Sequence, residues 1–190
     1  MDRPIIGYGL TGSFCTFRKS IEQMQLLLDN GYHVLPILSF HAASIDTRFG
    51  KAEDFIHELE SRTNRRVIRT IEDAEPIGPQ KLCDLLVVSP CTGNTLGKLA
   101  AGIYDTPITL AVKSQLRAQR PVLLGVSTND ALSGSAKALG TLLPVHNLYF
   151  LPMAQDAPQQ KPRSMVCLFE QTLPAVEAAL EGRQLTPIMR

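Results

Sequence analysis

Short apolar runs alternate with amphipathic segments along most of the chain. The apolar runs are bounded by Gly, Pro, Asn or Ser, which is typical of buried strands. We expect strands over residues 5–10, 33–40, 66–69, 82–89, 121–127 and 149–153. Between the runs, apolar side chains recur at every third or fourth position, which is the helical period. We expect helices over residues 14–29, 51–62, 92–102, 107–117, 134–143 and 164–181.

This alternation predicts an α/β fold: a doubly wound, mainly parallel sheet of about six strands, of Rossmann-like type. Right-handed crossovers then place ligands beyond the carboxyl ends of the strands. A length of 190 residues suits a single domain over residues 1–190, with its core between about 4 and 181. The Pro- and Gln-rich stretch 152–162 is expected to be a long irregular loop, which is either a surface connection or a lid.

Composition and charge exclude several classes of function. The 19 Lys and Arg residues nearly balance the 18 Asp and Glu residues, so no net field attracts nucleic acid or an anionic membrane. We expect neither as a partner, because the sequence also lacks a membrane-spanning apolar run and a signal-peptide pattern. The cysteines form no C-x-x-C pair, so we expect a cytoplasmic protein with reduced thiols and no metal site.

The glycines at positions 7, 9 and 12 have the G-x-G-x-x-G spacing of dinucleotide-binding folds. That fold also needs an acidic residue at the end of the second strand, where this chain has Ser39 instead. We therefore expect Thr11, Gly12 and Ser13 to form the first strand-to-helix turn, with amides and hydroxyls aimed at a phosphate and Ser39 nearby. The alternative is a turn with no ligand.

Two further strand ends are rich in small polar residues. They contribute Cys91, Thr92, Asn94, Thr95, Ser127, Thr128 and Asn129. Thr92 or Asn94 would also serve as a helix cap, which is the purely structural alternative. Three polar strand ends exceed what capping requires, and the carboxyl ends of parallel strands meet at one edge of a sheet. We therefore expect a mononucleotide-sized hollow there.

No residue is an obvious general base, so the catalytic residues stay unassigned, and Cys91 and Asn129 are the candidates. Cys91 precedes a helix N-terminus, a position that lowers a thiol pKa. Its alternative role is a small side chain packed against a ligand. Arg18 and Lys19 follow the first turn and are candidate anion-binding residues.

Three segments resemble the signatures of the flavoprotein family. They are Thr11–Ser13, Ser89–Lys98 and Thr128–Leu132. This family includes phosphopantothenoylcysteine decarboxylases, lantibiotic cysteine decarboxylases, flavin prenyltransferases and the B subunits of dipicolinate synthase. The resemblance extends from Ile5 to about Glu181. It implies a homo-oligomer, a trimer or a dodecamer, with flavin mononucleotide (FMN) between subunits.

The same resemblance implies a role for each polar strand end. Gly12 and Ser13 would bind the FMN phosphate, with Ser39 assisting. The ribityl chain and the flavin ring would lie against Cys91, Thr92, Asn94 and Thr95. The substrate site would be closed by Ser127, Thr128 and Asn129.

The chain departs from the decarboxylases of this family in two places. Their catalytic histidine corresponds to about Pro76, and the sequence has no histidine between His57 and His146. Their substrate motif ends in tryptophan, which this chain lacks entirely. Cysteine decarboxylation is therefore disfavoured.

Long runs of the chain resemble instead the B-subunit group. These are residues 7–16, 74–79, 89–100, 105–117 and 121–136. This resemblance implies an oxidoreductase subunit that works with a nicotinamide-binding A subunit carrying NADP. The pair would oxidise a small dicarboxylate, a dihydrodipicolinate-type precursor, in the mother cell of a spore-forming bacterium. An independent FMN-dependent decarboxylase and a non-catalytic scaffold are the alternatives.

Overall fold

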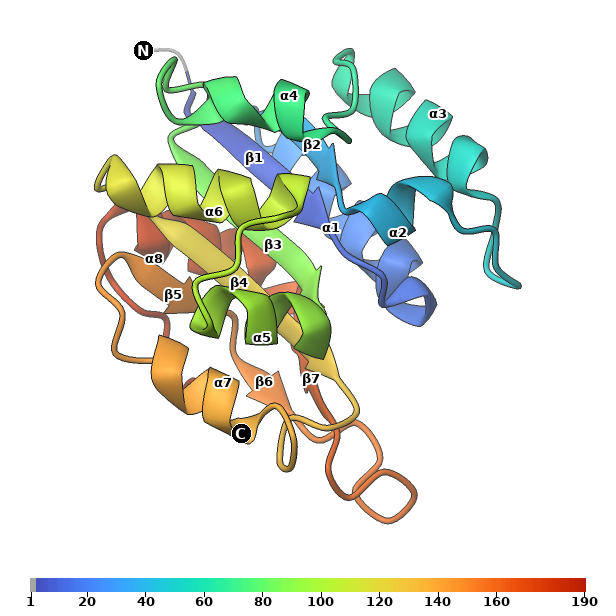
Figure 1. Ribbon diagram of the computed structural model, residues 1–190, viewed down its shortest axis with the longest axis vertical. Helices are drawn as coiled ribbons and strands as arrows, with labels where there is room; N and C mark the ends of the chain where they lie inside the picture. The colour runs from blue at the N-terminus through green and yellow to red at the C-terminus, as the bar shows by residue number, and fades with distance from the viewer. Residues whose placement is uncertain (1–2) are drawn as a thin grey trace.

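A computed structural model describes residues 3–190 and places a twisted sheet between two layers of helices (Figure 1). The strands that run parallel are β1 (Ile5–Leu10), β2 (His33–Leu38), β3 (Leu85–Cys91), β4 (Val122–Thr128) and β5 (Leu148–Phe150). Two short antiparallel strands, β6 (Met153–Ala154) and β7 (Met165–Cys167), extend the sheet beyond the end of β4. The predicted α/β class with a mainly parallel sheet is confirmed, with seven strands in the order β2-β1-β3-β4-β7-β6 and β5 beside β4.

Helices cover both faces of the sheet, as a doubly wound fold requires (Figure 1). One face carries α4 (Ile71–Ala74), α5 (Gly93–Ala100), α6 (Pro107–Arg117) and α7 (Ala136–Leu142). The other face carries α1 (Phe17–Asp29), α3 (Ala52–Thr63) and α8 (Thr172–Leu180). The short α2 (Phe40–Ser44) follows β2 directly, and 3-10 turns span Phe14–Thr16, Glu75–Ile77 and Phe169–Gln171. Within the described residues, no helix is long and apolar enough to cross a bilayer.

Three predicted elements differ in the structure. The strand expected over 149–153 is divided into β5, which pairs with β4, and β6, which pairs with β7. The strand expected over 66–69 is reduced to a single bridge between Ile68 and Ile37. Only two apolar residues, Val67 and Ile68, are available there, which is too few to bury a longer strand. The helix expected over 164–181 begins only at Thr172, because Met165–Cys167 pairs with the end of β4 instead. Sheet pairing overrides the local helical pattern at this point.

The segment 155–164 joins β6 to β7 and projects beyond the strand ends at the bottom of Figure 1. Hydrogen bonds within the loop fix its shape: Gln155 Nε2 donates to Pro162 O at 3.0 Å, and Ser164 N donates to Lys161 O at 3.0 Å. Leu132 N donates to Arg163 O at 3.0 Å, which ties the loop to the segment after β4. This hairpin loop therefore stands at the edge of the sheet where ligands are expected.

Asp130 holds the segment that follows β4. Its Oδ1 accepts hydrogen bonds from Thr128 Oγ1 at 2.5 Å and from Ser135 Oγ at 2.8 Å. The hydrogen bond from Thr128 is the main reason that the pKa of the Asp130 carboxyl is lowered, and the bond from Ser135 adds to it. Partial burial opposes this change. A Cβ on Gly93 would lie only 2.6 Å from Ser135 Oγ and 3.0 Å from Asp130 Oδ1. The glycine thus lets the start of α5 pack directly on this network.

The close packing at Gly125 gives a test of the sheet. In the centre of β4, an added Cβ would lie 2.6 Å from Ser89 Oγ and 2.8 Å from Leu151 Cδ1. We expect Gly125→Ala to lower the free energy of unfolding by about 1–3 kcal/mol in chemical denaturation. The matched control, Gly140→Ala in α7, has open space around the new methyl group and should raise it by up to about 1 kcal/mol. Equal effects at the two sites would contradict the packing described.

The Asp130 network gives a pH-dependent test. A carboxyl whose pKa is lower in the folded state stabilises the protein above its ordinary pKa of 3.8, and the contribution is lost as pH falls through the lowered value. Asp130→Ala should therefore reduce the free energy of unfolding by about 1–3 kcal/mol at pH 7. The difference from wild type should shrink below pH 4. This role would be refuted if the loss in free energy of unfolding did not change with pH, or if Asp54→Ala, at an exposed position, caused an equal loss.

Candidate functional site

Hydrogen bonds at Thr11 join the ends of β1 and β3. Thr11 Oγ1 donates to Pro90 O at 2.8 Å, and Thr92 N donates to Thr11 Oγ1 at 3.0 Å. Thr11 N also donates to Pro90 O, at 3.2 Å, and the residue is buried. The Thr11 hydroxyl is therefore engaged within the protein. Its effect on the site is to fix Gly12 and Thr92 next to each other.

The first cavity lies over the ends of β1, β2 and β3 and has a volume of about 440 Å³. It includes six residues that the sequence predicted, namely Thr11, Gly12, Ser39, Thr92, Asn94 and Thr95. The starts of α2 and α5 border it, because Ser39 and Thr92 are their N-cap residues. The predicted convergence of strand ends is thus present as geometry.

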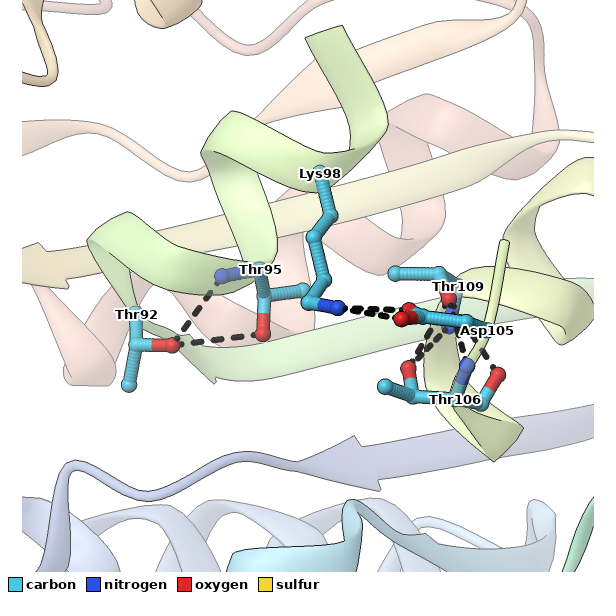
Figure 2. Close-up of polar contacts among 6 residues, drawn as sticks. All are labelled: Thr92, Thr95, Lys98, Asp105, Thr106 and Thr109. Carbon is cyan, nitrogen blue, oxygen red and sulfur yellow. Dashed lines mark hydrogen bonds and ion pairs between the residues drawn. The ribbon is translucent and has the colours of Figure 1, made fainter. Parts of the chain in front are cut away.

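The hydroxyl groups of the first cavity are only partly engaged within the protein. Ser39 Oγ accepts a hydrogen bond from Ala42 N at 3.3 Å, which leaves its own proton free to donate. Thr92 Oγ1 accepts from Thr95 N at 3.3 Å and donates to Thr95 Oγ1 at 3.2 Å (Figure 2). The Thr95 proton is therefore also free for a ligand.

An ion pair forms one wall of the first cavity. Lys98 Nζ lies 2.6 Å from both carboxylate oxygens of Asp105, and this hydrogen bond lowers the pKa of the Asp105 carboxyl (Figure 2). Asp105 precedes a capping box in which Thr106 and Thr109 bond each other's backbone N–H. The charge of Lys98 is thus balanced inside the protein, and the wall carries no free cation from this residue.

A second cavity of about 750 Å³ adjoins the first, with Gly12 and Thr92 shared between the two. Four more predicted residues line it, namely Ser13, Ser127, Thr128 and Asn129. Its other walls come from the start of α1, the segment between α2 and α3, and the hairpin loop 155–164. Ser13, Asn94 and Asn129 therefore lie around two joined hollows at one edge of the sheet.

Free backbone amides in the turn before α1 indicate an anion site. Among residues 3–190, the N–H groups of Gly12, Phe14 and Cys15 donate to no protein acceptor. Ser13 N is engaged, because it donates to Thr11 O at 2.7 Å. Gly12 borders both cavities, whereas Ser39 lines the first, and Phe14 and Cys15 line the second. Free donors on both sides of this junction match the acceptor oxygens of a phosphate monoester. The donor set therefore fits the phosphate end of a mononucleotide.

The structure corrects the prediction for Cys91. Its side chain is fully buried in the apolar cluster under α5 and α6 and lines neither cavity. Burial raises its pKa, so the expected lowering by the helix N-terminus is wrong. A thiol in this environment stays protonated and packs as a small apolar group. Cys91 is thus removed as a nucleophile and as a ligand contact.

Sequence reasoning missed several residues that line the second cavity. They are Arg48, Phe49, Asp156, Lys161 and Ser164. Lys161 Nζ lies 3.1 Å from Asp156 Oδ2. Partial burial opposes ionisation of Asp156, but hydrogen bonds from Ser164 and Lys161 outweigh it and lower the pKa. These residues sit in loops, where neither periodicity nor motif spacing gives a signal.

A second buried thiol supports the floor of the second cavity. Cys167 in β7 lies 3.5 Å from Ser127 Oγ and 3.9 Å from Ser89 Oγ. Burial raises the pKa of this thiol to about 11, so it is neutral near pH 7.

Over the described part of the chain, no group of three or more His, Cys, Asp or Glu is placed to hold a metal ion.

The sequence pattern of the flavoprotein family matches residues 1–138. The B subunit of dipicolinate synthase from Bacillus subtilis (strain 168) is 40% identical over 184 residues, covering 97% of this chain and 92% of that protein. Among solved structures, the corresponding B subunit from Bacillus halodurans C superposes with a TM-score of 0.90 and 36% identity, covering 98% of this chain and 96% of that one.

A more distant match extends the likeness in fold. DmrB from Burkholderia xenovorans in complex with FMN, described as a cubic protein cage for redox transfer, has a TM-score of 0.70 and 18% identity. The aligned region covers 95% of this chain and 96% of that one. The family match and the near full-length identity carry the assignment: the chain belongs to the flavoprotein family, in the group of dipicolinate synthase B subunits.

Proposed function

We propose that this chain is the B subunit of a dipicolinate synthase. It acts with a nicotinamide-binding A subunit to oxidise a dihydrodipicolinate-type precursor during sporulation. The observation that carries the proposal is the 40% identity over 97% of the chain to a protein of that name. The TM-score of 0.90 to a second such protein supports it.

FMN and the substrate bind in different parts of the two joined cavities. The FMN phosphate binds at the junction of the two cavities, against Gly12, Ser13 and Ser39. The ribityl chain lies in the first cavity, against Thr92, Asn94 and Thr95. The free N–H groups and hydroxyls described above support this assignment. When bound, FMN supplies a ring that exchanges a hydride. The substrate occupies the second cavity, beside Ser127, Thr128 and Asn129.

Oxidation of the dihydro ring to an aromatic ring removes one hydride and one proton. NADP held by the A subunit is the final acceptor of this hydride. No side chain of this chain is assigned as the base that takes the proton, because the buried Cys91 is excluded and Asn129 does not accept a proton near neutral pH. Asn129 is instead proposed to orient the substrate by hydrogen bonds from its amide.

We further propose that the chain is a single domain that forms a homo-oligomer, a trimer or a dodecamer, in the cytoplasm of the mother cell. Exposed large apolar side chains at Phe40, Ile45 and Ile103 support association, since such residues favour burial against a partner.

The flavin assignment is tested at the first turn. Ser13→Asp places a negative charge beside the proposed phosphate, and we expect FMN affinity to fall at least about hundredfold. The measurement is a titration followed by flavin absorbance near 450 nm and by calorimetry. Ser44→Asp makes the same change at an exposed site on α2 and should leave the affinity unchanged. An unaltered affinity in Ser13→Asp would place the phosphate elsewhere.

The assignment to a two-subunit enzyme is tested by reconstitution. Dipicolinate should form from the dihydro precursor and NADP only when both subunits are present, and the two should co-purify. Formation by the A subunit alone at the full rate would reduce this chain to a scaffold. Release of carbon dioxide from a cysteine conjugate by this chain alone would support the decarboxylase alternative.

A further inference from the structure

We propose that Lys19 and Arg48 bind the two carboxylates of a planar dicarboxylate whose ring lies against Phe14 and Phe49. This inference rests on the proposed function, because it specifies how the second cavity recognises its substrate. All four side chains line that cavity, and they come from two different parts of the fold. Lys19 and Phe14 belong to the start of α1 and the turn before it, and Arg48 and Phe49 to the segment between α2 and α3.

The charges of Lys19 and Arg48 are not balanced within the protein. Across residues 3–190, neither has a carboxylate partner within 4.0 Å. Other cations near the site are neutralised: Lys98 by Asp105, Lys161 by Asp156, and Arg18 by Glu58 at 2.6 Å. Two unmatched positive charges on one cavity favour a ligand that carries two negative charges.

Hydrogen bonds within the protein hold the segment that carries Arg48 in a defined turn. Thr47 and Gly50 exchange backbone hydrogen bonds at 3.0 and 3.1 Å, and Phe49 N donates to Thr47 Oγ1 at 3.1 Å. Asp46 Oδ1 accepts from Ala52 N at 2.9 Å, which fastens the segment to the start of α3. Because these bonds fix the turn, little conformational entropy is lost when a ligand is held there.

The apolar part of the cavity suits a flat ring. The guanidinium carbon of Arg48 lies 4.9 Å from the centroid of the Phe49 ring, so the charge and the aromatic surface are presented together. Phe14 is kept in place by its ring contact with Phe17, at 5.2 Å between centroids. A planar aromatic ring stacks or packs edge-on against such side chains, which adds affinity beyond the charge.

A neighbouring cavity of about 360 Å³ also includes Lys19 but is less suited to an anion. Asp156 lines both cavities, but Glu22 and Glu170 line only the smaller one. These two additional carboxylates would repel an anion there. The larger cavity is also the one joined to the proposed FMN site through Gly12 and Thr92.

The test measures ligand binding separately from activity. Dipicolinate, and isophthalate as a planar dicarboxylate that does not chelate metals, are titrated into the full chain by calorimetry. The titrations are run in metal-free buffer, with and without FMN and with the A subunit present. We expect Lys19→Gln and Arg48→Gln each to weaken binding of both ligands about tenfold, and the double variant about hundredfold. Benzoate, with one carboxylate, should bind more weakly than isophthalate to wild type.

Arg18→Gln is the matched control, because it removes one positive charge from the residue beside Lys19, on a side chain paired to Glu58. It should bind both dicarboxylates like wild type, and FMN affinity should be unchanged in all variants. Dicarboxylate affinities within twofold of wild type, or no binding to wild type under any of these conditions, would overturn the inference. A loss of FMN affinity in Lys19→Gln or Arg48→Gln would also overturn it, by placing the flavin phosphate at these cations. Wild-type binding with no dipicolinate formed by the two subunits would instead contradict the proposed function alone.

Discussion

The hydrogen bonds of Thr11 are the constraint on which the site depends. A threonine hydroxyl donates to Pro90 O and accepts from Thr92 N, so the ends of two neighbouring parallel strands are held in contact. This contact sets the turn before α1, with its free amides, next to the N-cap residue of α5. Without it, the polar strand ends would still lie at one edge of the sheet, but their donors would not face a shared pair of cavities.

Electrostatics separate the two cavities. In the first, Lys98 is neutralised by Asp105, and the donors that remain are amides and hydroxyls, which suit a phosphate held by many hydrogen bonds. In the second, Lys161 is neutralised by Asp156 while Lys19 and Arg48 stay unmatched. A mononucleotide and a small dianion therefore have different binding environments a short distance apart. The buried thiols of Cys91 and Cys167 are neutral near pH 7 and contribute packing rather than charge.

The sequence predicts the central strands and the polar strand ends because their signals are local. Adjacent residues alone are enough to identify an apolar run such as Leu82–Ser89 or a polar strand end such as Thr92–Thr95. Local periodicity favours helix over Met165–Cys167. The prediction is wrong there because these residues pair with β4, about 40 positions away in the sequence, which a local pattern does not show. The prediction for Cys91 is wrong because strand alternation, not proximity to a helix, decides which face its side chain occupies. Arg48 lies in a turn, where no periodicity marks it.

A crystal structure of this chain with FMN bound would show directly where the phosphate lies. We expect the phosphate at the junction of the two cavities, with an oxygen within about 3 Å of Gly12 N and another near Ser39 Oγ. We also expect the Thr11 contacts to Pro90 and Thr92 to persist. An FMN phosphate bound away from the ends of β1 and β2 would show that these strand ends do not form the flavin site.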